Sequence, residues 1–367
     1  MKKIIGIMII LVLSLNINLK AENFGLLYQT EVFVDNNAFS LWDYIEDNYS
    51  DMPMNFDNEI YAFNNQKEKI VVEFLDGDYF IGYIKEYEVR VESNDETALF
   101  YVEEGEDMNY NQEEYQANLI TLNQELEGII FGGRVLADNK RKFNFYLTGK
   151  LLEGKHLDWR DYDGTISAIE DGEGYTCSGI KRRINSDLND EMILCEEVFT
   201  SNGYSFGCQF NWQMNSKFKL SYRGENINSR INWNDVYTEA QPLDDIRLNY
   251  NISGSYKQDF FPYQDGELRW GTEDYITRLV PEHDIKLEGS LSEIGVFYYD
   301  LDYGRRFYPY FNYKLVYKDL IFRPGIFWPF YTLEINYKGI NFKLKSKDLN
   351  IFNSSGLCAD LRLSYQF

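Results

Sequence analysis

Histidine, cysteine and long apolar runs are all scarce in this chain of 367 residues. With only 2 His and 4 Cys, the chain has few of the side chains that most often bind transition metals or act as general bases. Past residue 21, no run approaches the roughly 20 apolar residues that a membrane-spanning helix needs. Together with a mean hydropathy of -0.44 and 26% charged residues, this excludes a helical membrane protein.

Basic residues are also in deficit. Lys and Arg number 36 against 59 Asp and Glu, which gives a formal net charge of -23. No Lys or Arg occurs between Val91 and Gly133. Because binding to a phosphate backbone depends on a basic surface, nucleic acid is excluded as a partner.

The N-terminus has the features of a secretory signal peptide. Lys2 and Lys3 precede an apolar run from Ile4 to Leu15, and Ala21 supplies a small residue for cleavage. We predict that residues 1–21 are removed, which changes the formal net charge to -26 because three Lys are lost.

Aromatic residues, by contrast, are abundant, at 17% of the chain with 30 Tyr and 26 Phe. A polar average composition with many aromatic residues is typical of a membrane β-barrel. There one face of each strand meets lipid, the other meets water, and aromatic girdles lie at both interfaces.

Apolar and polar residues alternate with a period of two, most clearly after residue 203. Tyr204, Phe206 and Phe210, for example, share one face, opposite Ser205 and Gln209. About eleven such strands follow, joined alternately by tight turns and longer connections. The pattern indicates hairpins with short periplasmic turns at 215–216, 318–319 and 338–339.

Further strands are predicted at 24–34, 69–75, 79–91, 126–137 and 142–152. The predicted fold is all-β: a transmembrane antiparallel β-barrel of roughly 16–20 strands over residues 22–367. It has acidic N-terminal loops and long excursions near 35–54, 153–203 and 255–282. The alternative is a soluble all-β protein, such as a sandwich or propeller, whose apolar faces share a core.

The last strand carries a family resemblance. Leu361, Leu363, Tyr365 and Phe367 occupy alternate positions at the C-terminus. This resembles the insertion signature of bacterial outer-membrane β-barrel proteins, of a porin-like kind but no specific subfamily. The resemblance implies export to the outer membrane of a Gram-negative cell, contact with lipid and lipopolysaccharide, and recognition of these four residues by the barrel assembly machinery.

The face opposite the apolar one should line the lumen. We expect it to form a basic wall that faces an acidic wall or acidic loops, because charged rings set the ion preference of pores. The alternative is that these charges are only solvated inside a wide barrel. The candidate pore-lining residues are Lys217, Lys219, Arg223, Arg230, Arg247, Lys314, Glu334, Lys343, Lys345, Asp360 and Arg362.

Other motifs are weaker. Residues 159–170 resemble the calcium-binding loop of an EF-hand, with Asp161, Asp163 and Glu170 as candidate ligands, but an ordinary Asp-Gly turn explains them better. The acidic blocks 43–57 and 103–107 suit solvated loops or cation bridges to lipopolysaccharide. Cys177 and Cys195 are a candidate disulfide within one external excursion.

No cofactor and no enzymatic activity are expected. Neither His156 nor His283 has the His-x-Ser arrangement of barrel phospholipases, and Ser201 lacks a neighbouring His. Glu282 and Asp284 flank His283, but adjacency in sequence is not catalytic geometry.

The sequence therefore predicts an outer-membrane porin-like channel for passive or weakly selective diffusion of small polar solutes, possible as a homo-oligomer. The alternative is a non-channel outer-membrane protein, either a plugged specific transporter or a surface adhesin.

Overall fold

The computed structural model describes residues 24–36, 59–75, 77–97, 99–100, 114–138, 142–168, 174–186, 199–249, 269–301, 304–349 and 354–366. Within these residues, no helix is long and apolar enough to cross a membrane. The predicted signal peptide lies outside them, as does Phe367.

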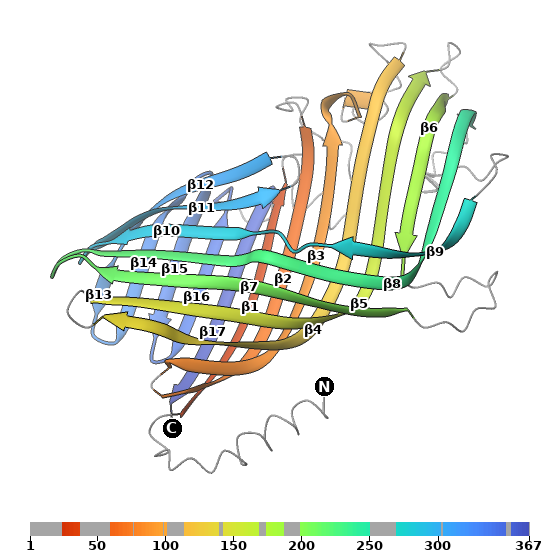
Figure 1. Cartoon of the computed structure of the whole chain (residues 1–367). Coiled ribbons are helices and arrows are strands. Elements are labelled where there is room, and N and C mark those ends of the chain that lie inside the picture. Colours follow the sequence, from red (N-terminus) through yellow and green to blue (C-terminus); the bar gives the residue numbers. More distant parts are fainter. Residues whose placement is uncertain are drawn as a thin grey trace.

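The described chain forms one antiparallel sheet of 17 strands (Figure 1). The strands are β1 (Phe24–Asn36), β2 (Glu59–Phe74), β3 (Tyr79–Asn94), β4 (Glu114–Asp138), β5 (Phe143–Ala168), β6 (Gly174–Asn185), β7 (Thr200–Gln213), β8 (Lys219–Asn249), β9 (Arg269–Thr277), β10 (Glu282–Glu288), β11 (Ser292–Leu301), β12 (Gly304–Tyr313), β13 (Leu315–Tyr317), β14 (Leu320–Phe327), β15 (Phe330–Tyr337), β16 (Ile340–Ser346) and β17 (Gly356–Gln366).

Fourteen of these strands close into a ring, because β1 pairs with both β2 and β17. β6 and β9 lie beside the upper parts of β5 and β8 and extend the sheet beyond the ring, and β13 adds a short edge on β14. The predicted fold class, a transmembrane-type antiparallel β-barrel, is therefore confirmed. The sheet has a strand number within the expected 16–20, although the closed ring uses fewer.

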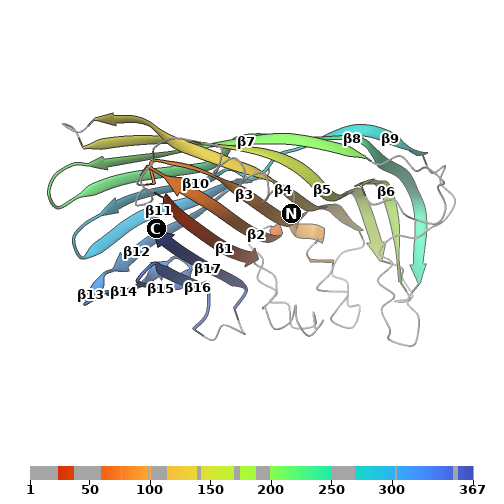
Figure 2. The ribbon, with the colours of Figure 1, turned by 90° about the horizontal axis from the view of Figure 1, so that it is seen from below.

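The barrel is taller on one side than on the other. β4, β5 and β8 have 25, 26 and 31 residues, whereas β10 and β16 have 7 each. The long strands and their partners β6 and β9 project past the ring as a wall (Figure 2). We call this projection the tall wall.

Tight turns gather at the other end, which we call the turn end. β15 and β16 meet at Lys338 and Gly339, both with positive φ, 45° and 84°. This is the two-residue geometry that matches the twist of a hairpin. The pairings place the turns at 215–216, 318–319 and 338–339 at the same end as Gln366, as the alternation predicted.

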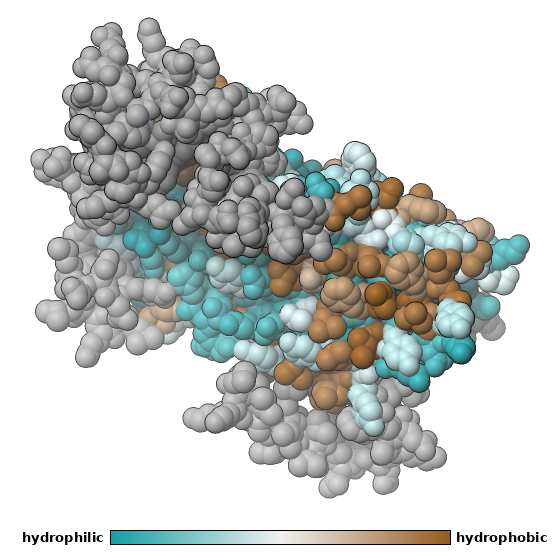
Figure 3. Space-filling model, turned by 180° about the vertical axis from the view of Figure 1, so that it is seen from behind, coloured by the Kyte–Doolittle hydropathy of each residue, from teal (hydrophilic) through white to brown (hydrophobic). Residues whose placement is uncertain are grey.

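The outer face near the turn end is an apolar belt. Large apolar side chains are exposed there on many strands, including Leu147 at 46%, Ile285 at 44% and Phe311 at 50%. Brown surface gathers over this part of the barrel and gives way to teal toward the tall wall (Figure 3). Exposed apolar area on this scale needs a covering, which a lipid bilayer provides.

Above the belt, the outer face of the tall wall becomes charged. Lys85 pairs with Glu125 at 2.8 Å, and Lys155 pairs with Glu127 at 3.0 Å. These ion pairs mark the edge of the apolar belt, so the higher parts of β4, β5, β6, β8 and β9 lie outside it.

The predicted excursion at 153–203 is largely strand, and the one at 255–282 is strand in part. Residues 153–203 contain the upper half of β5, all of β6 and the start of β7, and residues 255–282 contain β9. The excursion near 35–54 falls mostly outside the described residues. Composition suggested an excursion at 153–203 because charged residues cover the tall wall.

Candidate functional site

A row of charged side chains runs around half of the inner wall. Each member stands opposite the next in the strand pairing, across seven consecutive strands from β14 to β3. The row is Arg323, Glu334, Lys343, Asp360, Glu31, Lys67 and Glu86. The signs mostly alternate, which favours the pairing of opposed residues.

Some of these charges pair along the wall itself. Arg323 forms an ion pair with Glu334, which also accepts a hydrogen bond from Asn341 Nδ2 at 2.9 Å. Asp360 accepts from Arg362 Nη2 at 2.9 Å and from Gln29 Nε2 at 3.1 Å. These contacts hold the inner wall in one arrangement.

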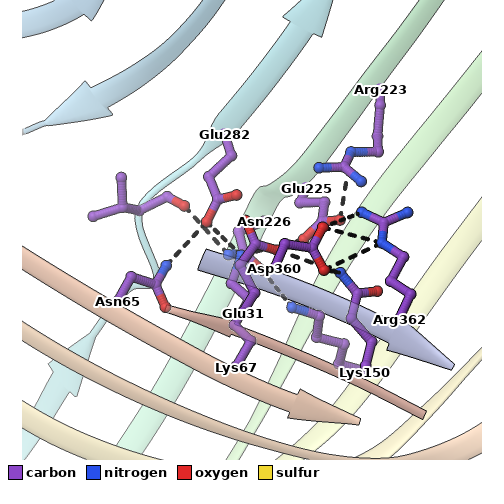
Figure 4. Close-up of polar contacts among 12 residues, drawn as sticks. Glu31, Asn65, Lys67, Lys150, Arg223, Glu225, Asn226, Glu282, Asp360 and Arg362 are labelled. Atoms are coloured by element: carbon purple, nitrogen blue, oxygen red, sulfur yellow. Dashed lines mark hydrogen bonds and ion pairs between the residues drawn. The ribbon is translucent and has the colours of Figure 1, made fainter. Parts of the chain in front are cut away.

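Lys67 crosses the lumen. From β2 its Nζ reaches Glu225 Oε2 on β8 at 3.3 Å and Glu282 Oε1 on β10 at 2.5 Å, although four strands of the ring separate β2 from β8. Asn65 Nδ2 donates to the same Glu282 oxygen at 3.0 Å. Figure 4 shows Lys67 and the two carboxylates converging from different strands. We call this contact the ionic bridge.

A second buried ion pair lies beside the ionic bridge. Lys150 on β5 contacts Glu86 on β3, and its Nζ donates to Asn226 Oδ1 on β8 at 3.0 Å. The Lys150 and Glu86 side chains are 5% and 2% exposed. Buried charges persist only when paired and hydrogen-bonded, so this contact fixes the spacing of three strands.

Aromatic rings fill the lumen on the side of β1 and β11–β17. Phe33 on β1 packs against Tyr299 on β11, with ring centroids 5.1 Å apart, across a gap of five strands in the ring. Tyr308 and Phe330 join the same buried cluster. Lys345 lies among these rings, with its Nζ 3.4 Å from the Phe327 centroid. This aromatic cluster and the ionic bridge together span the barrel.

The segment that joins β9 to β10 closes the remaining side, and we call residues 277–280 the strap. Thr277 Oγ1 donates to Gln124 Oε1 at 2.9 Å, and Gln124 Nε2 donates to Glu88 Oε1 at 3.3 Å. These bonds join the strap to β4 and β3 across the barrel. The Leu279 amide donates to Ser229 Oγ at 2.9 Å, which holds the strap against β8 past the last β8–β9 pair, Ile231 and Thr277.

Above the strap, between it and the tall wall, lies a cavity of about 890 Å³. We call it the mouth cavity. Its lining comes from β3, β4, β5, β8, β9, the strap and the end of β11. The strap and Asn226, which accepts a hydrogen bond from Lys150, both line it, so the cavity adjoins the closed part of the lumen.

Most of the predicted pore-lining residues do lie on the inner side. Glu334, Lys343 and Asp360 belong to the charged row, and Lys345 is buried in the aromatic cluster. Arg223 reaches Glu225 at 3.7 Å, and Arg362 pairs with Asp360. Lys219 shares the inner face with Arg223, and Lys314 is half-buried between β12 and β13. Their role in permeation stays a prediction.

Two predicted pore-lining positions are wrong. Lys217 lies exposed in the turn between β7 and β8, outside any strand. Arg230 is exposed, while its neighbours Ser229 and Ile231 are buried on the inner face. β8 holds two extra residues between the pairs Phe206–Asn228 and Cys208–Gly224, so the same alternate positions face inward on both sides of this irregularity. Arg230 has the opposite parity to Arg223 and therefore lies on the outer face. The side chain of Arg247 lies outside the described residues.

The stretch interpreted as an Asp-Gly turn, with a calcium loop as the weaker alternative, is a strand. Asp161 and Asp163 lie within β5, and Asp161 pairs with Arg182 at 3.5 Å. Glu170 lies outside the described residues, in which no group of three or more potential ligands could hold a metal. A strand cannot wrap its side chains around one ion as a loop does.

The remaining motifs are placed as follows. Cys177 is buried in β6, whereas Cys195 lies outside the described residues, so their disulfide stays a prediction. His283 faces outward, where Tyr222 Oη lies 2.9 Å from Nδ1, while Glu282 points into the lumen. The three residues 282–284 therefore do not converge. Leu361, Leu363 and Tyr365 occupy one face of β17, as expected, and their recognition by an assembly machinery stays a prediction.

Sequence reasoning missed the residues that close the lumen, above all Lys67, Glu86, Glu225 and Glu282. Alternation alone places Lys67 and Glu86 on inner faces, because apolar residues occupy the alternate positions that face outward in their strands. Their partners could not be predicted from the sequence, because contact across a barrel depends on the distance between opposite walls of the closed ring.

No protein-family model and no curated protein matches the chain. Among solved structures it is similar to the TodX deltaS2S3 mutant monoaromatic hydrocarbon channel, at 8% identity over 94% of this chain and 91% of that chain, with a TM-score of 0.42. It is also similar to the outer membrane protein OpdK from Pseudomonas aeruginosa, at 9% identity over 95% and 99%, with a TM-score of 0.13. A third is CdiB from Escherichia coli, at 6% identity over 92% and 63%, with a TM-score of 0.20. No specific subfamily follows from these matches.

Proposed function

We propose that the protein is an outer-membrane channel that admits small polar solutes through a narrow lumen closed at rest by its own side chains. The observation that carries this proposal is the ionic bridge, which joins opposite walls of a ring lined with charged and amide groups. An apolar outside and a polar inside suit passage across a membrane. Because side chains span the lumen, a gated and selective channel fits better than a wide, freely permeable one.

Opening requires Lys67 to leave Glu225 and Glu282. Such a rearrangement is local, since the three side chains belong to strands that are otherwise held by their own ladders. Solvated charges in an opened lumen would then set ion preference.

Recordings from single channels in lipid bilayers test the proposal. Wild-type protein should show small or infrequent openings, and Lys67→Met should raise the conductance or the open fraction. Lys85→Met, which removes an ion pair on the outer face, should leave both unchanged. If Lys67→Met does not fold, the double variant Lys67→Met with Glu282→Gln removes the bridge without an unpaired acid at Glu282.

Absence of conductance from wild type and from both bridge variants would overturn the channel and favour the non-channel alternative. Localisation is tested separately. Outer-membrane fractionation and a heat-dependent shift in gel mobility are expected, and a soluble protein without that shift would contradict the proposal.

A further inference from the structure

The mouth cavity has the dimensions of a ligand site. Its volume of about 890 Å³ lies within the range of roughly 300–1,000 Å³ that is usual for small-molecule pockets. It lies where the tall wall rises above the ring, so a solute arriving from the end opposite the turn end meets it before the closed part of the lumen. Its occupant would therefore rest directly above the closed lumen.

Two aromatic rings give the cavity a platform. Trp159 on β5 and Tyr275 on β9 both line it, with centroids 5.6 Å apart and planes inclined by 41°. Leu122 and Leu279, both buried, also line the cavity, and the two rings pack against the cluster that contains them. The face of an aromatic ring carries negative potential, and it attracts partly positive C–H groups.

Polar groups of both signs complete the lining. Arg90 and Glu92 come from β3, and Arg278 and Asp300 come from the strap and β11. An anion would meet the two carboxylates among them, and a cation would meet the two guanidinium groups. Arg90 pairs with Glu88 at 2.9 Å and Asp300 with Arg305 at 3.0 Å. A hydrocarbon would still displace water from the charged groups that line the cavity without replacing its hydrogen bonds, which is costly.

A neutral polyhydroxylated ring avoids both penalties. Its hydroxyl groups donate to carboxylates and accept from guanidinium groups, and its C–H face stacks on an aromatic platform. We propose that the mouth cavity binds a saccharide, a mono- or disaccharide in size, with Trp159 as the stacking residue. This rests on the proposed function, because it names the solute class of that channel.

Calorimetric titration of the purified full-length protein in detergent micelles tests the inference, with sucrose as the probe. Wild type should bind it saturably, and Trp159→Ala should weaken binding about tenfold. Trp159→Phe, which keeps a ring, should restore most of the affinity. Trp212→Ala is the matched control, since Trp212 lies on the outer face of β7 and is 38% exposed.

Several results would overturn the inference: no saturable binding of sucrose, equal affinity in wild type and Trp159→Ala, or preferential binding of toluene or glutamate. If Trp159→Ala lacks the heat-dependent gel shift of a folded barrel, Glu92→Gln replaces it. It should weaken binding, because an NH2 donor takes the place of one of the two carboxylate oxygens that accept from sugar hydroxyls. Saccharide binding without conductance would overturn only the proposed channel function. Conductance without saccharide binding would overturn only the proposed saccharide site.

Discussion

Lys343 and Lys217 are chemically alike but lie in different surroundings, which makes them a matched pair for testing the lumen. Lys343 stands between Glu334 and Asp360 in the charged row, and Lys217 lies in an exposed turn. Lys343→Glu should shift permeability toward cations, because charged rings set ion preference. Lys217→Glu should not. Reversal potentials under a salt gradient measure both, and an equal shift in the two variants would contradict the assignment.

The inner faces of single residues could be predicted wherever the strand is regular. Glu334, Lys343 and Asp360 follow strict alternation back from the C-terminus, and all three lie inside. The prediction for Arg230 was wrong because the irregularity in β8 inserts two residues and leaves the parity of the inward positions unchanged, so Arg230 and Arg223 lie on opposite faces. The ionic bridge could not be predicted, because sequence carries no distance between β2 and β8.

Among the elements, the tall wall depends on an ion cluster that joins β5 to β6. Asp158 accepts from Arg160 Nη2 at 2.6 Å and from Arg183 Nε at 3.2 Å. Burial acts to raise the pKa of Asp158, but the hydrogen bond and charge of Arg160 and the charge of Arg183 outweigh it and hold the pKa below its usual range. A depressed folded pKa means that this stabilisation is present above the unfolded value, near pH 4, and is lost as pH falls through the folded value.

Hydrogen exchange of the β5 and β6 amides at acidic pH measures this effect. Wild type should keep its protection down to about pH 4 and lose it below. Asp158→Asn should be less protected near neutral pH and should show little dependence on pH. The same acid dependence in both proteins would show that another group is responsible.

The upper part of β5 shows why some elements escaped prediction. Asp161, Asp163 and Gly164 have the composition of a turn, yet they pair with both β4 and β6. Tyr162 and Ile166 are buried on one face, which is a strand pattern over too few residues to outweigh the acidic ones. Long-range pairing decided the conformation there.

For the molecule as a whole, the apolar belt determines which part lies in the bilayer. Leu147 in the belt and Ile180 in the tall wall are 46% and 44% exposed, so they differ in surroundings but not in burial. Leu147→Lys should cost about 2–4 kcal/mol of folding free energy in lipid vesicles. Ile180→Lys should change it by less than about 0.5 kcal/mol. Denaturant titrations in vesicles measure both, and equal costs would place the bilayer elsewhere.

The seam between β1 and β17 also has a kinetic consequence. Eleven residue pairs join Gly25–Asp35 to Gly356–Gln366, and more than 300 residues separate the partners. Contacts so distant in sequence form slowly, whereas each hairpin can form from its own local turn. Until the last strand arrives, β1 and β16 are open edges that invite pairing with other chains. Correct assembly therefore requires that β17 pairs with β1 and β16 before another chain pairs with those edges. A chain that stops before Gly356 stays an open sheet.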